Sequence, residues 1–308
     1  MSEIGRTASL FLISGASIIW GFLGLCIRDL SAAGLTSIQM FELRCLMCTV
    51  IIAVVFLITD KSKFRVSKRD LKFLVLIGVT KVAADTCYFQ AQLMVDLSLA
   101  AVLENTEPYF VAIISYFMFR ERLSRIQKLS LIVAFVGCMM VSGVLGGVGE
   151  VNAIGIAVGL ISGFTFALYT VGVKKVTDNG CNSGTILFYI FLVSSVCTFP
   201  FCDPVSMVQI TFSDTNTLYQ VLMLGIVFTL IPYYMHALCL KGISATMSSV
   251  VLFLEVVMCA IVGAMFFGEI PTVITVVGMV FVFIGILMIN REDSHTESSS
   301  EESVRRST

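Results

Sequence analysis

Two carboxylates in the middle of one long apolar stretch are the side chains best suited to chemistry in this sequence. Glu104 and Glu107 lie in LSLAAVLENTEPYFVAIISYFMFRE, residues 97–121, and Pro108 follows them. Residues three apart share one helix face, and Pro108 leaves the carbonyl of Glu104 without a backbone partner. Such an arrangement can bind a proton or a cation, so we expect Glu107 to do so. The alternative is that Glu107 only joins helices through hydrogen bonds.

A second stripe of polar side chains precedes this stretch. Lys81, Asp85 and Tyr88 follow the i, i+4, i+7 spacing of one helix face. Lys81 and Asp85 either form a local ion pair that lowers the cost of burying them, or face a cavity and bind the charged ends of a zwitterion. An ionisable group inside a membrane span costs about 2.5–3.5 kcal/mol on insertion scales, so groups retained there typically line a pathway.

The stretch around Glu107 returns at a constant offset of 148 residues (245 − 97). Residues 245–269 read ATMSSVVLFLEVVMCAIVGAMFFGE, so that Glu107 aligns with Glu255. The same offset aligns LISG at 12–15 with LISG at 160–163. A fixed offset over most of a half indicates a duplication. We expect a first copy at residues 8–145 and a second copy at residues 152–290.

The second copy has neutral groups where the first has its polar stripe. The residues that align with Lys81, Asp85 and Tyr88 are Thr229, Tyr233 and His236. A cavity built from both sets has chemically different walls, as substrate recognition requires. His236 either takes up a proton between pH 5 and 8 or stays a neutral hydrogen-bonding group between helices.

Glu42 and Arg44 are charged residues of another apolar stretch, two positions apart, so they do not face each other on a helix. Arg44 either anchors its helix, to Glu42 or to another span, or binds a substrate carboxylate.

Aromatic rings and prolines complete the candidate site, because rings can enclose organic cations and prolines interrupt helices. The side chains expected to contact substrate are Trp20, Lys81, Asp85, Tyr88, Glu104, Glu107, Tyr109, Tyr169, Tyr233 and His236. The expected proton-coupling residues are Glu107 and Glu255. The expected gate or hinge residues are Pro108, Pro232, Glu121 and Glu269, although the last two can instead be plain helix caps.

The amino-acid composition indicates that membrane-spanning helices position these groups. The chain has 308 residues, of which 57% are hydrophobic and 13% charged, and its mean hydropathy is +0.95. Soluble domains carry about 25% charged residues, so this is the composition of an all-α membrane protein. A span needs about 20 apolar residues, which predicts ten spans at 8–27, 36–58, 72–93, 97–119, 126–145, 152–173, 184–202, 217–240, 243–267 and 272–290.

The distribution of Lys and Arg predicts the orientation. With a cytoplasmic N-terminus, all but three of the 20 basic residues lie on the cytoplasmic side, the exceptions being Arg28, Arg44 and Lys81. Both termini are then cytoplasmic, and residues 291–308 form a polar, disordered tail. Because each copy has five spans, the second enters the membrane from the opposite side. Inverted repeats of this kind are typical of alternating-access transporters.

Other functional classes find no support in the sequence. Cys45 and Cys48 have CxxC spacing, but no second pair accompanies them, so we interpret them as packing residues. Neither His236 nor His295 lies in an HExxH motif. We expect no enzyme activity, no metal, no cofactor and no nucleic-acid partner.

The two copies resemble the paired EamA-type domains of the drug/metabolite transporter superfamily. The resemblance is carried by AAVLENTEPYFVAIISYFMFRERL and LSLIVAFVGCMMVSGVLGG in the first copy, and by IPYYMHALCLKGISATMSSVV and FFGEIPTVITVVGMVFVFIGILMI in the second. The second copy has Glu255-Val256 where such domains commonly have Glu-Pro, which puts the helix kink there in doubt.

The resemblance implies a secondary transporter of small polar metabolites, such as amino acids, working as an exporter. Together with the carboxylates it favours proton coupling and a central cavity between the copies; the alternative is a passive facilitator. The expected partners are a small-molecule substrate, the proton and the lipid bilayer. We expect a monomer or homodimer in the plasma membrane.

Overall fold

The computed structural model describes residues 4–120, 123–141, 152–266 and 272–289, and this part of the chain is all-helical. The expected tail at 291–308 and the expected gate residues Glu121 and Glu269 lie outside the described residues. The helices of the first copy are α1 (Arg6–Gly21), α2 (Leu23–Ala32), α3 (Ser37–Thr59), η1 (Lys61–Phe64), α4 (Lys68–Met94), α5 (Leu97–Glu104), α6 (Glu107–Phe119) and α7 (Arg125–Val141).

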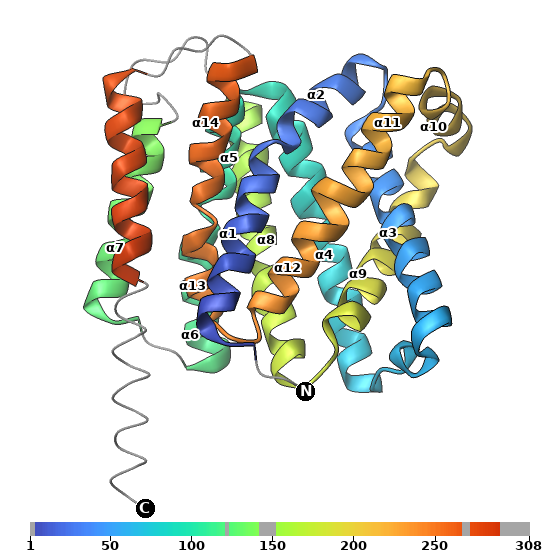
Figure 1. The fold of residues 1–308 in the computed structure, drawn as a ribbon, viewed down its shortest axis with the longest axis horizontal. Helices are drawn as coiled ribbons and strands as arrows, with labels where there is room; N and C mark the ends of the chain where they lie inside the picture. Colours follow the sequence, from blue (N-terminus) through green and yellow to red (C-terminus); the bar gives the residue numbers. More distant parts are fainter. Residues whose placement is uncertain (1–3, 121–122, 142–151, 267–271, 290–308) are drawn as a thin grey trace, which may run out of the picture.

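The second copy follows the same order with one insertion (Figure 1). Its helices are α8 (Ala153–Asp178), α9 (Ser183–Thr198), η3 (Phe199–Phe201), α10 (Pro204–Thr211), α11 (Thr215–Leu222), η4 (Met223–Leu230), α12 (Ile231–Cys239), α13 (Ala245–Val251), α14 (Leu254–Phe266) and Val273–Ile289. In Figure 1, α1 runs upward from the N-terminus whereas its counterpart α8 runs downward.

Each expected apolar run coincides with one helix or with consecutive helices. Among the described residues, six of these segments are long and apolar enough to cross a membrane. They are Arg6–Ala32, Ser37–Thr59, Ala153–Asp178, Ser183–Phe201, Thr215–Cys239 and Ala245–Phe266. α7 is shorter, with 17 residues, and α4 carries several charges along its 27 residues. The count of ten spans therefore stays a prediction.

Both copies interrupt the same helix at the same place. α5 ends at Glu104, and α6 begins at Glu107 with Pro108 in its first turn, where the missing N–H of proline costs nothing. In the second copy, α13 ends at Val251 and α14 begins at Leu254. The doubt raised by the missing proline is thus resolved by the structure, which has the interruption there without a proline.

The second copy has a π-helical segment where the first copy has a regular α-helix. α4 is continuous, whereas its counterpart consists of α11, the π-helix η4 and α12. The Thr229 hydroxyl donates to the carbonyl of Leu224 at 2.6 Å, five residues back. Pro232 lies in the first turn of α12. π-Helical turns are frequent at functional sites.

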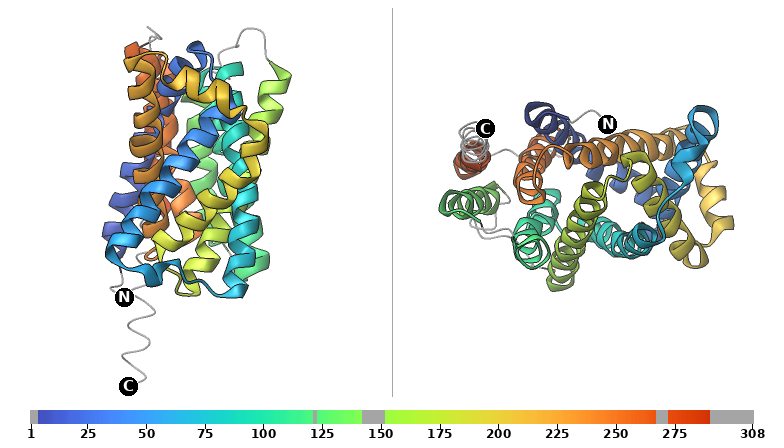
Figure 2. Two further views of the ribbon diagram at one scale, coloured as in Figure 1. Left: turned by 90° about the vertical axis from the view of Figure 1, so that its right-hand side faces the viewer. Right: turned by 90° about the horizontal axis from the view of Figure 1, so that it is seen from below.

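α7 and Val273–Ile289 form a pair of helices at one edge of the bundle (Figures 1 and 2). A Cβ placed on Gly278 would lie 2.7 Å from the carbonyl oxygen of Gly137, so the two backbones are in direct contact. The Ser130 hydroxyl donates to the carbonyl of Gly285 at 2.7 Å. These small residues therefore pack helices of the same chain, as small faces do in membranes.

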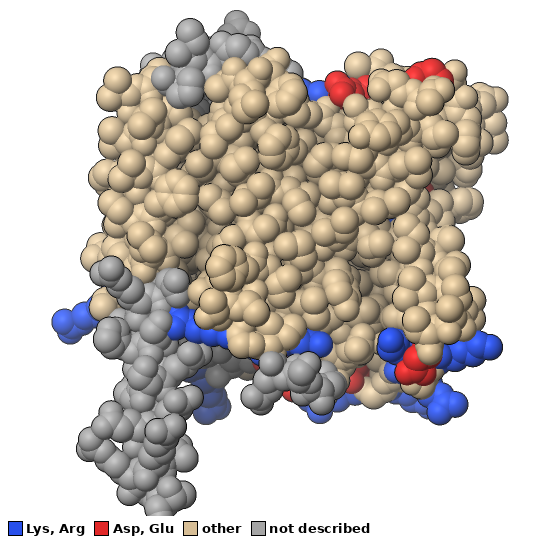
Figure 3. Space-filling model, viewed as in Figure 1, with Lys and Arg blue, Asp and Glu red and all other residues tan. Residues whose placement is uncertain are grey.

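On the face shown in Figure 3, exposed charged side chains lie at the two ends of the bundle and leave a wide uncharged band between them. Lys and Arg gather along the lower edge, where the described part of the chain begins, and the few acidic groups of the upper edge lie opposite. The core of this bundle combines α1, α3, α4, α8, α9 and α12. It places the polar groups of α3, α4 and α12 at mid-height.

Candidate functional site

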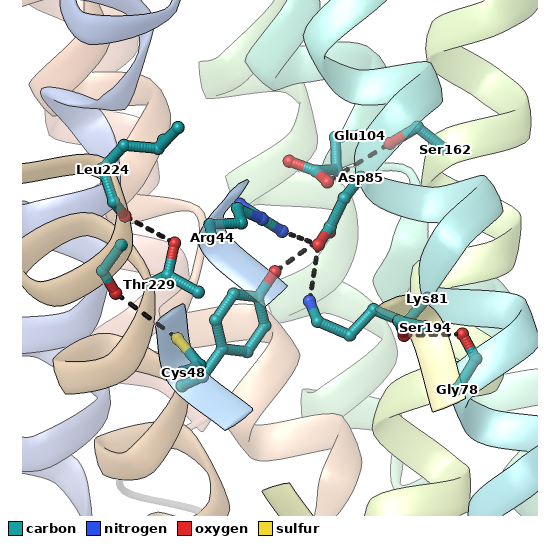
Figure 4. Close-up of polar contacts among 12 residues, drawn as sticks. Arg44, Cys48, Gly78, Lys81, Asp85, Glu104, Ser162, Ser194, Leu224 and Thr229 are labelled. Carbon is teal, nitrogen blue, oxygen red and sulfur yellow. Dashed lines mark hydrogen bonds and ion pairs between the residues drawn. The ribbon is translucent and has the colours of Figure 1, made fainter. Parts of the chain in front are cut away.

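Asp85 is the centre of a buried charge cluster in α4. The Lys81 ammonium donates to its carboxylate at 2.6 Å from one helical turn away. Arg44 of α3 forms an ion pair with the same carboxylate (Figure 4). The hydroxyl of Tyr233 in α12 donates to the other oxygen of Asp85 at 3.0 Å. One carboxylate thus joins three helices from both copies.

Aromatic rings surround the two cations. The Arg44 guanidinium carbon lies 4.7 Å from the centroid of the Phe89 ring, and the Lys81 ammonium lies 3.4 Å from that of Tyr233. A cation over an aromatic face gains about 0.5–2 kcal/mol, most when it is desolvated. Of the alternatives left open for Arg44, the structure has the anchor to another helix and not to Glu42.

Glu42 belongs to a separate buried contact between α3 and α9. Its carboxylate accepts hydrogen bonds from the hydroxyls of Ser195 and Thr198, both at 2.5 Å. Glu42 is fully buried, but it does not line the pocket described next.

A pocket opens beside Asp85, between the two copies. The residues that line this central pocket are Trp20, Leu23, Arg44, Asp85, Tyr88, Phe89, Glu104, Phe166, Tyr233 and Glu255. The cavity volume is about 20 Å³, which in this conformation leaves room for about one water molecule. Trp20 forms an aromatic wall with Tyr233, their ring centroids 4.9 Å apart.

Three further carboxylates lie at or behind this pocket, each held by hydroxyl groups. Glu104 accepts from Ser162 at 3.2 Å (Figure 4), and Glu255 accepts from Tyr88 at 2.5 Å. All of these acids are buried. Arg44 and Lys81 are paired with Asp85. The carboxyl groups of Glu104 and Glu255 therefore have hydroxyl groups, and not these cations, as hydrogen-bond partners.

Glu107 lies behind the pocket rather than in its wall. It accepts hydrogen bonds from Thr170 of α8 at 2.7 Å and from Ser249 of α13 at 2.8 Å, and it is only 1% exposed. Of the two carboxylates expected to share a face, Glu104 lines the pocket and Glu107 joins three helices.

His236 is enclosed by aromatic rings next to the pocket. Its ring centroid lies 6.0 Å from those of Trp20 and Tyr169, and 6.1 Å from that of Phe166. The side chain is 0% exposed. Neither ring nitrogen has a hydrogen-bond partner among the residues that the structure describes, and the same holds for the Tyr169 hydroxyl. The expectation of a hydrogen-bonded histidine between helices is therefore not met in this conformation.

Five expected substrate contacts do not line the pocket: Lys81, Glu107, Tyr169 and His236, which lie next to it, and Tyr109. The Tyr109 hydroxyl donates to the carbonyl of Leu131 at 3.2 Å, and its ring packs on Phe135 in α7, 5.2 Å between centroids. The helix break at Thr106 turns this part of α6 away from the pocket. The residues that sequence reasoning did not place there are Leu23, Phe89 and Phe166. With 24 phenylalanines in the chain, no signal separates those of the pocket from those of the surface.

The described residues contain no group of three or more His, Cys, Asp or Glu arranged to hold a metal ion. All ten cysteines are free and fall within the described part.

Comparisons with known proteins cover nearly the whole chain. The sequence model of the EamA-like transporter family matches residues 7–143 and again 153–291. An uncharacterized transporter of Clostridium kluyveri is 26% identical over 234 residues, 74% of each chain. The pseudopaline exporter CntI of Pseudomonas aeruginosa is 23% identical over 276 residues, 90% of this chain and 93% of that one. A solved crystal structure superimposes with a TM-score of 0.74 at 15% identity, covering 95% of this chain and 100% of the other, which shows a shared fold.

Proposed function

The chain belongs to the EamA-like transporter family, and we propose that it exports small polar metabolites, amino acids or related compounds, by proton-coupled alternating access through the central pocket. A member of this family is a multi-pass membrane protein and a transporter, not an enzyme. The finer statement about substrate, direction and coupling is our proposal, and the following observations support it.

The observation that carries the proposal is the distribution of charge in the central pocket. Arg44 is paired with Asp85 on one wall but keeps its Nε–H without a hydrogen-bond partner among the described residues, while Glu104 and Glu255 offer carboxyl groups on another wall. A molecule with a carboxylate and an ammonium group matches both walls, and the Trp20 ring offers an apolar surface for the rest.

Proton coupling is supported by the number of buried carboxyl groups. Glu104, Glu107 and Glu255 have hydroxyl partners rather than cationic partners. A buried carboxylate without a cation is costly and readily takes up a proton, so these groups can exchange protons as the substrate's ammonium arrives and leaves. We assign the coupling to Glu107 and Glu255, one in each copy.

The arrangement in the membrane is part of the proposal. We propose ten spans in two inverted copies, at 8–145 and 152–290, followed by a cytoplasmic tail. The gathering of Lys and Arg at one face supports a cytoplasmic location of that face (Figure 3). Export is further supported by the name of the pseudopaline exporter among the relatives, and we propose the plasma membrane as the location.

The test uses the purified full chain in liposomes that contain a pH-sensitive dye. Amino acids, amines and small sugars are added one at a time to wild type, Glu107→Gln and Glu42→Gln. We expect a pH change with one class of compound that is lost in Glu107→Gln. Glu42→Gln is the matched control, because Glu42 is equally buried but lies away from the pocket.

Other outcomes correct the proposal in defined ways. A pH change that Glu107→Gln retains would move the coupling to Asp85, Glu255 or His236. Uptake of labelled substrate without any pH change would favour a passive facilitator. Absence of uptake for every compound class would contradict the proposed substrates.

A further inference from the structure

Three pairs of polar residues at the centre of the molecule are related by the offset of 148. They are Asp85 with Tyr233, Tyr88 with His236, and Glu107 with Glu255. Any contact between the copies therefore has an equivalent, obtained by replacing each residue by its counterpart. In a transporter built from inverted copies, such equivalent contacts form in the conformation of opposite access.

One of these contacts is made and its equivalent is not. The Tyr88 hydroxyl of the first copy donates to Glu255 of the second at 2.5 Å. The equivalent contact joins His236 of the second copy to Glu107 of the first. In this structure both nitrogens of His236 are without hydrogen-bond partners among the described residues, and Glu107 accepts from Thr170 and Ser249.

The sequence explains why the two carboxylates differ in this conformation. The counterparts of Thr170 and Ser249 in the first copy are Phe22 and Ala101, which have no hydroxyl to donate. Glu255 therefore accepts from Tyr88, whereas Glu107 has a second set of donors that holds it when His236 is not available. Glu107 can exchange one set of partners for another without becoming an unpaired buried acid.

The part of α12 around His236 contacts the chain neighbours of both groups that hold Glu107. The His236 ring stacks against Tyr169, the neighbour of Thr170 in α8. Three residues further along the chain, Cys239 contacts Ser248, the neighbour of Ser249 in α13, at 3.5 Å between sulfur and oxygen. α12 is therefore packed against both segments, α8 and α13, that supply the donors to Glu107.

We propose that His236 donates a hydrogen bond to Glu107 in the conformation of opposite access, as the counterpart of the Tyr88–Glu255 hydrogen bond seen here. This inference rests on the alternating access proposed above. It gives His236 a positioning role on a carboxylate that the proposed function assigns to proton coupling. It also gives one of the two buried imidazole nitrogens, both without a partner among the described residues here, a hydrogen-bond acceptor.

A metal ion bound jointly by side chains at positions 107 and 236 tests directly whether these two positions come together. The variant Glu107→His places a second imidazole at 107 while His236 remains. If the two side chains meet, they bind Ni²⁺ together. Trp20, the only tryptophan in the sequence, lies next to His236, so quenching of its fluorescence by Ni²⁺ reports the binding. We expect half-maximal quenching at a Ni²⁺ concentration about 10²-fold lower than for wild type, as for a second ligand held in place.

Two variants serve as controls for this experiment. Glu107→His with His236→Phe keeps every other metal-binding residue, including all cysteines and His295, and should lose the tight binding. Tyr88→His with Glu255→His bridges the contact that the structure shows, and establishes that Ni²⁺ reaches the pocket and quenches Trp20. If Glu107→His does not purify as a folded protein, Glu107→Cys with Cd²⁺ replaces it, with the corresponding controls.

The outcomes separate this inference from the proposed function. Tight binding in the Tyr88/Glu255 variant with weak binding in Glu107→His would overturn the inference, because the pocket would be accessible and the two positions would not meet. Ni²⁺ binding needs no substrate, so tight binding in Glu107→His together with no transport by wild type would keep the contact and reject the proposed substrates. Where wild type does transport, His236→Tyr should retain the activity and His236→Phe should reduce it.

Discussion

Asp85 and Tyr233 hold equivalent positions in the two copies and are hydrogen-bonded to each other at 3.0 Å. The offset of 148 in sequence therefore coincides with a contact in space, and the relation between the copies is centred on this pair. The pair is chemically unequal, since one member is a carboxylate that forms ion pairs with both Arg44 and Lys81 and the other is a neutral phenol. The centre of the molecule is thus symmetric in position and asymmetric in charge.

The first prediction concerns the charge at this centre. Asp85→Asn leaves the Arg44 guanidinium and the Lys81 ammonium buried without their carboxylate. Breaking a buried ion pair by removing one partner costs about 3–5 kcal/mol, so the midpoint of thermal unfolding should fall strongly. Thermal unfolding of the purified protein, followed by Trp20 fluorescence, measures this.

The control for this prediction is Lys81→Met in the Asp85→Asn background. It removes one of the two uncompensated charges and should recover part of the lost stability. An Asp85→Asn protein as stable as wild type would show that the cations find other partners.

The second prediction concerns the hydrogen bond between Tyr88 and Glu255. Tyr88→Phe leaves the Glu255 carboxyl group without its donor, and an unsatisfied buried group costs about 1–3 kcal/mol. Tyr233→Phe should cost less, because Asp85 keeps Arg44 and Lys81 as partners. A thermodynamic cycle of Tyr88→Phe and Glu255→Gln should show a coupling between the two positions; additive effects would mean that the hydrogen bond adds no stability.

The third prediction concerns the pair formed by α7 and Val273–Ile289. Gly278→Val adds a Cβ 2.7 Å from the carbonyl oxygen of Gly137 and 2.7 Å from the Cβ of Met140. Overpacking of this kind costs about 1–3 kcal/mol, so the thermal midpoint should fall. Val276→Leu, at a half-exposed position of the same helix, is the control and should leave the midpoint unchanged. Equal thermal midpoints for both variants would show that the two helices can move apart without a loss of stability.

The sequence predicts the helical elements well because hydropathy and proline are local signals. The apolar runs, the break before Pro108 and the stripe of Lys81, Asp85 and Tyr88 all follow from spacing alone. The break in the second copy could not be predicted with confidence, because no proline marks it and it depends on the packing of Leu252 and Phe253, both buried.

Contacts between helices are what the sequence does not specify. Arg44 and Asp85 are 41 positions apart in sequence (85 − 44), yet the fold joins them in an ion pair. In the same way the fold places Glu104 in the pocket wall and Glu107 behind it, although both share one apolar stretch. Tyr109 was expected in the pocket because aromatic rings within a span can enclose an organic cation, but it contacts α7 instead.

The last prediction concerns the wall of the pocket opposite Arg44. In the proposed function, Glu104 binds the ammonium group of the substrate; within the described part of the chain its hydrogen-bond donor is Ser162. Glu104→Gln removes a charged hydrogen bond of about 1.5–3 kcal/mol. Since 1.4 kcal/mol corresponds to a tenfold change, the KM of an amino acid should rise about tenfold or more.

A matched pair of substrates distinguishes binding of the ammonium group by Glu104 from a purely structural role of Glu104. The 2-oxo acid of the same carbon skeleton keeps the carboxylate and lacks the ammonium group, so Glu104→Gln should leave its KM unchanged or lower it. Liposome uptake of both labelled compounds measures the two values. If the KM rises equally for the amino acid and the 2-oxo acid, Glu104 maintains the shape of the pocket through Ser162 and does not bind the ammonium group. If only the amino acid is affected, the wall opposite Arg44 recognises the ammonium group, because the two compounds differ at no other point.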